Sequence, residues 1–290
     1  MFYTRLQVIC DPEFSEILMA EIAEVGFDTF METEKGFEAF VEKEKFDHAH
    51  LEDIKEKYKH VNPLIFFQNK IQKQNWNEEW EKSIDPIIVD DRCLVRAEFH
   101  TIENLPALPT GQAGGRQGKY PYEIVITPKM SFGTGHHQTT YLMLKSQMKM
   151  NHSGKRVMDA GCGTAILSIM ASKLGATAVE AFDIDEWSTV NGKENIENNK
   201  CDNVHLHQGK ISQMKFRGEF DIILANINKN VLLEEIKVYA DFLCSGGQLL
   251  LSGFYTQDID HLKQEASRFA LTEVLRDEKE TWASLLLQKK

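Results

Sequence analysis

The chain has 290 residues, and its 44 Asp and Glu outnumber its 33 Lys and Arg, which gives a formal net charge of −11. Apolar residues make up 42% and charged residues 27%, values ordinary for a globular protein that exclude collagen, a disordered tail protein and a disulfide-stapled miniprotein. Apolar runs are only a few residues long, against the about 20 that a membrane-spanning helix needs. The N-terminus lacks a basic segment followed by an apolar run, so we expect neither a transmembrane helix nor a signal peptide.

Cysteine and charge content bear on compartment and partners. The five cysteines are odd in number and include no C-x-x-C, which favours reduced thiols in the cytoplasm. Basic residues are scattered along the chain, whereas proteins that bind nucleic acid usually gather them in a patch. We therefore expect a cytoplasmic protein without direct nucleic-acid or membrane contact. The acidic balance fits a basic partner protein, although acidity also serves solubility alone.

The first 70 residues follow the order β-α-β-β-α-β. Apolar residues alternate in the first strand, over residues 2–10, after which Asp11 and Pro12 mark a helix start and Gly26 its end. A second, charged helix is expected over 46–58, and the other strands over 27–33, 37–42 and 64–67. This order predicts a small ferredoxin-like α+β domain over residues 1–70.

Two segments link this domain to the rest of the chain. Residues 71–90 are expected to form a helical linker in which Trp76 and Trp80, one helical turn apart, dock on a neighbour, with substrate binding as the alternative. Residues 106–119 hold four glycines and two prolines and are expected to form a mobile surface loop. A phosphate cradle is disfavoured there because no strand leads in and no helix follows.

From residue 155 onward, strand and helix patterns alternate. Strands are expected over 155–160, 178–183, 204–207, 220–225 and 248–252, and helices over 164–174, 186–199, 229–243 and up to about 268. Such alternation predicts a doubly wound α/β domain with a mainly parallel sheet and helices on both faces. Two successive strands, near 270–276 and 281–288, predict an antiparallel hairpin at one edge.

The first of these strands runs into D-A-G-C-G-T-A, from Asp159 to Ala165. Glycines allow a sharp turn and a close approach to a ligand. A dinucleotide fingerprint needs a further glycine where Ile166 stands, which disfavours a NAD-dependent oxidoreductase. The spacing resembles motif I of class I S-adenosylmethionine (AdoMet) methyltransferases, with Ala165 at the third glycine position, which we expect to serve mainly helix packing. Taken alone, Gly161 and Gly163 also fit an ordinary tight turn.

Two polar residues end the neighbouring strands. Asp183 ends the second strand, where an acid accepts hydrogen bonds from ribose hydroxyls, while Asp185 is expected to cap the next helix. Asn226 ends the 220–225 strand at the edge where such sheets bind ligands. It is either a helix cap or a residue that aligns an acceptor amine, and no Pro-Pro-Tyr follows it to stack on a nucleic-acid base.

A fourth motif covers residues 130–140 and reads M-S-F-G-T-G-H-H-Q-T-T, before a helix expected over 141–150. Gly-Thr-Gly at a helix start suits an anion, but the GK[ST] of a P-loop is missing. His136 and His137 are adjacent and point apart, with no further ligands at metal-binding spacing. We therefore expect no metal site.

Together these motifs resemble one family. F-G-T-G-x-H-x-T-T, D-x-G-C-G, D-I-D and A-N-I, in this order, are similar to the bacterial methyltransferases of large-subunit ribosomal protein eleven. The similarity extends to the Trp76–Trp80 pair and to Glu280–Ala283 near the C-terminus. Gln138 in place of proline, Ala165 in place of glycine, and the 106–119 loop depart from the pattern.

The resemblance implies that residues 1–70 capture the ribosomal protein and that residues 91–290 form an AdoMet-dependent methyltransferase domain. The family methylates lysine side-chain and N-terminal amines. Carried over by position, the implied AdoMet contacts are Thr140, Gly161, Asp183 and Asn226, in the turn that includes Gly163, with Phe132, Gly133 and His137 around the mouth of the pocket. Asn226 also aligns the acceptor in this scheme, and no side chain is assigned as a general base. The alternatives are methylation of another protein, a nucleic acid or a small-molecule amine, and a non-catalytic AdoMet-binding interaction protein.

Overall fold

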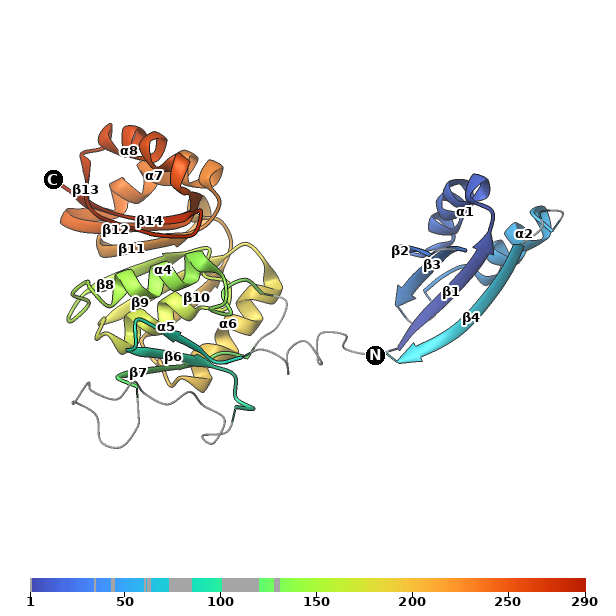
Figure 1. The fold of residues 1–290 in the computed structure, drawn as a ribbon, viewed down its shortest axis with the longest axis horizontal. Coiled ribbons are helices and arrows are strands. Elements are labelled where there is room, and N and C mark those ends of the chain that lie inside the picture. Colours follow the sequence, from blue (N-terminus) through green and yellow to red (C-terminus); the bar gives the residue numbers. More distant parts are fainter. Residues whose placement is uncertain are drawn as a thin grey trace. The chain divides into compact units, whose positions relative to one another are not determined.

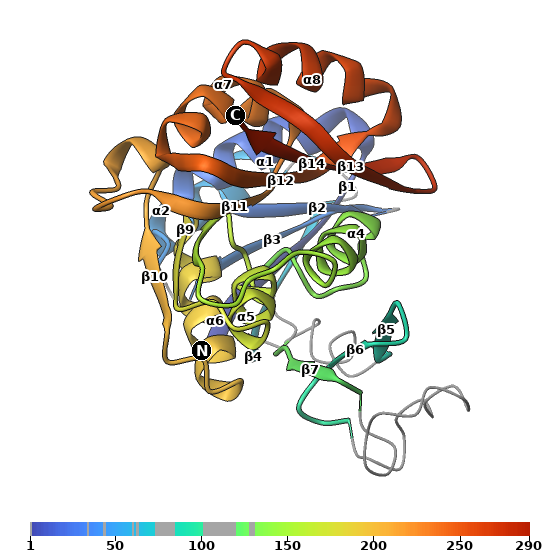
Figure 2. The ribbon, with the colours of Figure 1, turned by 90° about the vertical axis from the view of Figure 1, so that its left-hand side faces the viewer.

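The computed structural model describes residues 2–33, 35–42, 45–59, 61, 64–72, 85–100, 120–127 and 131–290. The chain divides into two compact units, Met1–Glu79 and Trp80–Lys290 (Figures 1 and 2). The predicted loop over 106–119 lies outside the described residues, as do Trp76 and Trp80 of the predicted helical linker. The described ends of that linker are strands, not helix, because residues 71–72 continue β4 and residues 87–89 form β5.

The first unit is a four-stranded antiparallel sheet with two helices. Its elements are β1 (Phe2–Cys10), α1 (Pro12–Val25), β2 (Thr29–Thr33), β3 (Gly36–Glu42), α2 (His48–Lys57) and β4 (Leu64–Gln72). The strand order β2-β3-β1-β4 is that of a split βαβ unit, in agreement with the ferredoxin-like pattern expected from the sequence.

Local sequence signals account for these elements. The inward positions Leu6, Val8 and Cys10 of β1 are buried. Gly26 ends α1 in a left-handed conformation, with φ of 116°. Asp11 is the N-cap residue of α1, but its side chain makes no capping hydrogen bond. Asp47, by contrast, accepts hydrogen bonds from two backbone amides at the start of α2. α1 therefore begins at Pro12 without a side-chain cap, whereas α2 begins with one.

The second unit is built on a seven-stranded sheet. Its strands are β8 (Arg156–Ala160), β9 (Ala178–Asp183), β10 (Val204–Gln208), β11 (Phe220–Asn226), β12 (Leu243–Tyr255), β13 (Leu271–Lys279) and β14 (Trp282–Lys289). The order is β10-β9-β8-β11-β12-β14-β13, with parallel pairing from β10 to β12. β14 is antiparallel to both of its neighbours, so the predicted hairpin is present and its second strand lies inside the sheet.

Helices cover both faces of this sheet. Figures 1 and 2 show α4 (Gln138–Gln147), α5 (Ile166–Lys173) and α6 (Glu186–Asn198) on one face, and α7 (Lys229–Phe242) and α8 (Ile259–Ser267) on the other. A separate buried apolar cluster fills each interface. This is the doubly wound, mainly parallel α/β architecture with an antiparallel edge that the sequence predicts. α4 begins at Gln138, three residues before the expected helix at 141.

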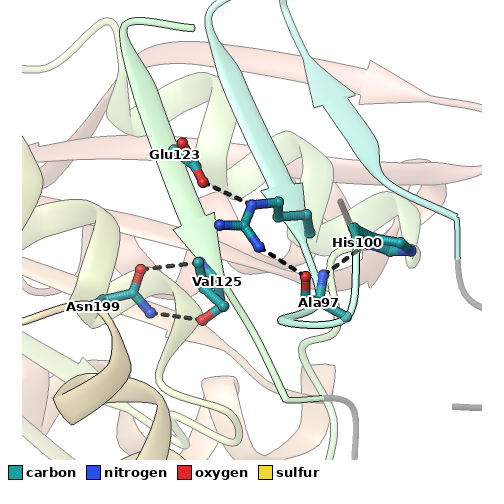
Figure 3. A network of polar contacts seen from close by, with 6 residues as sticks. Ala97, His100, Glu123, Val125 and Asn199 are labelled. Carbon is teal, nitrogen blue, oxygen red and sulfur yellow. Dashed lines mark hydrogen bonds and ion pairs between the residues drawn. The ribbon is translucent and has the colours of Figure 1, made fainter. Parts of the chain in front are cut away.

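A three-stranded sheet was not expected. It consists of β5 (Ile87–Val89), β6 (Cys93–Arg96) and β7 (Tyr122–Val125), with β6 antiparallel to β5 and parallel to β7. Val95 and Ile124 place it in the same apolar cluster as α4 and α5. Arg96 of β6 forms an ion pair with Glu123 of β7, and Figure 3 shows the polar contacts around Glu123 and Val125 on this sheet. Among the described residues, no helix is both long and apolar enough to cross a membrane.

Candidate active site

Three strands of the large sheet bring the predicted site residues to one edge. Ala160, the last residue of β8, pairs with Phe182 of β9 and with Ala225 of β11. Gly161, Asp183 and Asn226 come at or directly after these positions, and they therefore lie at the carboxyl edge. β9 and β10 are added on one side of β8, and β11 and β12 on the other side. The strand order therefore switches between β8 and β11, and open α/β sheets bind ligands at such a switch point.

The turn after β8 requires its glycines. Gly161 and Gly163 have φ of 67° and 52°, in the left-handed region that glycine adopts at little cost. A Cβ on Gly163 would lie 2.3 Å from the carbonyl oxygen of Phe132, and a Cβ on Gly161 would lie 2.5 Å from a methyl carbon of Ile227. The turn is therefore packed directly against the segment around Phe132.

Asp183 braces this turn. Its Oδ2 accepts a hydrogen bond of 2.8 Å from the Gly163 amide, and its Oδ1 accepts one of 3.0 Å from the Asp185 amide. A carboxylate has further lone-pair positions, so it can accept ribose hydroxyls as well. Asp185 caps α6, as expected, by accepting a hydrogen bond from the Ser188 amide.

Ala165 meets a backbone demand in addition to the packing expected from the sequence. It has φ of 63° and is the N-cap residue of α5. This left-handed conformation favours glycine and costs other residues about 1–2 kcal/mol, while the side chain is fully buried in the apolar cluster under α5.

The segment around Phe132 is fastened to the same turn. The Thr164 amide donates a hydrogen bond of 3.0 Å to the carbonyl of Phe132, and the Thr164 hydroxyl donates one of 2.6 Å to the carbonyl of Gly133. The Phe132 ring itself is 54% exposed. The backbone of this segment therefore supports the turn, while its aromatic ring faces solvent.

Four rings form a row at this edge. The ring of His137 lies 5.3 Å from that of Phe132 and 4.7 Å from that of Trp282, which in turn lies 4.3 Å from that of Tyr255. His137 caps α4, with Nδ1 accepting a hydrogen bond from the Thr139 amide. Burial lowers the pKa of His137, so this imidazole is neutral near pH 7. The row therefore presents an apolar, uncharged surface.

Buried polar atoms without partners indicate where a ligand fits. Several described residues have such atoms, and those of the predicted site and its glycine motif are Thr140 Oγ1, Asp159 Oδ1 and Asn226 Oδ1. Leaving such an atom unpaired costs about 1–3 kcal/mol, so a ligand with donor groups satisfies them favourably. AdoMet carries an ammonium group and ribose hydroxyls, and the residues therefore fit it.

Asp159 is a site residue to which sequence reasoning assigned no role. Its side chain is fully buried, and its Oδ2 accepts a hydrogen bond of 2.6 Å from Ser168. Burial, with a smaller contribution from the nearby charge of Asp183, raises the pKa of Asp159 to about 7 against the lowering effect of the Ser168 hydrogen bond. Its place as the first acid of the D-x-G-x-G motif was the signal available in the sequence.

Asn195 was also missed. Its carboxamide donates to the carbonyl of Thr164 and accepts from the amide of Thr127. The available signal was the recurrence of asparagine every four residues, at Asn191, Asn195 and Asn199, which places all three on one helix face.

The structure joins the predicted residues to different extents. Phe132, Gly163 and Asp183 are linked by direct contacts, and Gly161 belongs to the same turn. Asn226 reaches this edge through the pairing of β11 with β8, and Thr140 lies in the first turn of α4, three residues after His137. Within the described part of the chain, no group of three His, Cys, Asp or Glu residues is arranged to hold a metal ion.

Comparisons with known proteins place the chain in one family. The sequence model of the ribosomal protein L11 methyltransferase (PrmA) family matches residues 15–290. The L11 methyltransferase of Porphyromonas gingivalis is 40% identical over 272 residues, which cover 93% of this chain and 89% of that protein. The corresponding protein of Chlorobaculum tepidum is 31% identical and covers 97% and 94% of the two chains.

A solved structure gives the same result. The ribosomal protein L11 methylase of Lactobacillus delbrueckii subsp. bulgaricus superposes with a TM-score of 0.61 at 25% identity, covering 71% of this chain and all of that one. The sequence and the fold therefore lead to the same family. The chain belongs to the ribosomal protein L11 methyltransferase family of AdoMet-dependent enzymes.

Proposed function

We propose that this chain transfers methyl groups from AdoMet to lysine side-chain and N-terminal amines of ribosomal protein L11. Family membership supports the substrate. The observation that carries the chemistry is the glycine turn braced by Asp183, at the same edge as the unpartnered oxygens of Asp159 and Asn226.

Different residues of the chain bind the ribose and the amino-acid end of the cofactor in this proposal. Asp183 is placed to accept ribose hydroxyls, and the oxygens of Thr140, Asp159 and Asn226 are available for the amino-acid end. When bound, AdoMet supplies a methyl group already activated by its sulfonium. The protein therefore needs to position the two reactants and exclude water rather than supply a nucleophile.

The acceptor must arrive as a neutral amine. A lysine amine has a reference pKa of about 10.4, and burial disfavours its charged form. The row of Phe132, His137, Trp282 and Tyr255 offers an apolar approach, and the neutral imidazole adds no competing positive charge. In this proposal Asn226 aligns the acceptor as well as contacting AdoMet, and the amine loses its proton to water.

The N-terminal unit suits the capture of a basic protein. Residues 1–79 hold 17 Asp and Glu against 9 Lys and Arg, so they carry −8 of the chain's net charge of −11. Proteins that bind RNA neutralise its phosphates with Lys and Arg, and opposite charge raises association rates. Our proposal therefore assigns the unit that ends with β4, at Gln72, to substrate capture, and the unit whose first strand is β5, from Ile87, to methyl transfer. The five free cysteines fit a cytoplasmic location.

Mass spectrometry of purified L11, incubated with the full chain and AdoMet, tests the function. We expect mass increases of whole methyl groups that map to lysine and N-terminal amines, and none without AdoMet. A fragment starting at Trp76 contains both apolar clusters of the second unit and none of the first. It should bind AdoMet but lose methylation of intact L11. Full activity of the fragment would contradict the capture role, and unmodified L11 with the full chain would contradict the function.

A further inference from the structure

One face of α6 lies against the glycine turn. Asn191 and Asn195 on this face are buried, with 1% and 0% of their surface exposed. Between them, a Cβ on Gly192 would lie 3.1 Å from the carbonyl oxygen of Gly163 and 3.5 Å from Cβ of Ala165. Side chains on this face can therefore reach the backbone of the turn.

Asn195 connects the turn to the strand β7. Its Nδ2 donates a hydrogen bond of 3.0 Å to the carbonyl of Thr164, and its Oδ1 accepts one of 2.8 Å from the amide of Thr127, two residues after β7 ends. Thr164 itself binds the carbonyls of Phe132 and Gly133. Two neighbouring segments are therefore held at Thr164. Thr127 is connected to it through Asn195, and Phe132 is hydrogen-bonded to it directly.

Asn199 provides an internal comparison. Its Oδ1 accepts a hydrogen bond of 3.0 Å from the Val125 amide and its Nδ2 donates one of 2.6 Å to the Val125 carbonyl, as Figure 3 shows. Both asparagines thus hold the backbone at or just after β7 with good geometry. Only Asn195 also holds the cofactor turn.

We propose that Asn195 is a positioning residue for methyl transfer. It keeps the glycine turn and the segment that carries Phe132 and His137 in one fixed geometry, so that the acceptor route stays aligned with the cofactor. This inference rests on the proposed function. Methyl transfer is sensitive to such alignment, because small displacements of reacting groups cost up to about 100-fold in rate.

Asn195→Ala and Asn199→Ala form a matched pair. Each removes one carboxamide that binds β7 or the residues after it, fully buried at Asn195 and partly buried at Asn199, so both should lower the thermal unfolding temperature. We expect the kcat for methylation of L11 to fall at least about tenfold in Asn195→Ala, with KM for L11 little changed, and to stay within about twofold of wild type in Asn199→Ala. Equal loss of kcat in the two variants would overturn the proposal.

Asn195→Asp separates the two bonds and serves if the alanine variant fails to fold. The carboxylate can still accept from Thr127 but cannot donate to Thr164, so we expect its kcat to fall as well. A wild-type kcat for this variant would overturn the proposal.

Hydrogen exchange provides a readout independent of L11. The Thr127 and Thr164 amides should both exchange faster in Asn195→Ala than in Asn199→Ala, and unchanged exchange at Thr164 would also overturn the proposal. If the wild-type protein leaves L11 unmodified, the proposed function is wrong. The exchange rates then still test whether Asn195 holds Thr164 and Thr127 in place.

Discussion

Asp183→Ala gives the most informative test of the cofactor site, because Asp183 has two separable roles. The substitution removes the two observed hydrogen bonds to the amides of Gly163 and Asp185, of 2.8 and 3.0 Å. Hydrogen bonds to a charged group contribute about 1.5–3 kcal/mol each. Since the side chain is partly exposed and water can replace it, we expect the protein to lose about 1–3 kcal/mol of stability and to remain folded.

The proposed bonds to ribose come in addition to this loss. Loss of one such bond is enough to weaken cofactor binding at least about tenfold, which corresponds to about 1.4 kcal/mol. Calorimetric titration with S-adenosylhomocysteine and with its 2′-deoxy analogue measures the contribution of the ribose hydroxyl to binding. The wild type should bind the deoxy analogue at least about tenfold more weakly, and Asp183→Ala should bind the two alike. Asp183→Asn keeps one acceptor oxygen, so its preference for S-adenosylhomocysteine over the deoxy analogue should lie between those of the wild type and Asp183→Ala.

If Asp183→Ala retains the wild-type preference for the ribose hydroxyl, Asp183 does not bind the ribose. In that case the carboxylate only braces the turn, and weaker binding would follow from a displaced Gly163. Thermal unfolding without ligand measures the brace separately.

Three further predictions concern the same edge. Gly163→Ala should unfold at a lower temperature than Gly154→Ala and lose AdoMet binding. Both positions have positive φ, but an added Cβ at Gly163 would lie 2.3 Å from the Phe132 oxygen, whereas nothing lies within 4 Å at Gly154. Equal melting temperatures of the two variants would contradict this prediction. Asn226→Ala should lower AdoMet affinity and the single-turnover rate together, and wild-type values of both would leave Asn226 without a role in the site. AdoMet affinity should rise with pH through about 7 as Asp159 ionises to receive the ammonium group, and Asp159→Asn should abolish this dependence in calorimetry. Without ligand, the raised pKa of Asp159 acts in the opposite direction: its contribution to stability is full below 3.8 and is lost as pH rises through about 7.

Much of the catalytic unit could be predicted because its signals are local. β9 has the predicted bounds, since a mostly apolar run ends in an acid at Asp183. The cap at Asp185 follows the same short-range logic. The edge position of Asn226 followed from strand alternation alone, because parallel strands expose their carboxyl ends together.

The rest depends on contacts distant in sequence. β5, β6 and β7 have only three or four residues each, too few for a periodic pattern, and they are held by the apolar cluster under α4 and α5. The role of Asn195 depends on Thr127, which lies 68 residues earlier. Its periodicity was visible in the sequence, but its partners were not. The left-handed backbone of Ala165 likewise depends on how α5 begins against the turn.

The internal position of β14 has a consequence for biosynthesis. β13 joins the large sheet only through β14, although β13 precedes it in the sequence. During translation, β13 therefore has no strand to pair with until β14 has left the ribosome and inserted beside β12. β14 also brings Trp282 to the row of rings beside His137. The sheet edge and the row of rings are therefore completed together, once β14 has inserted beside β12.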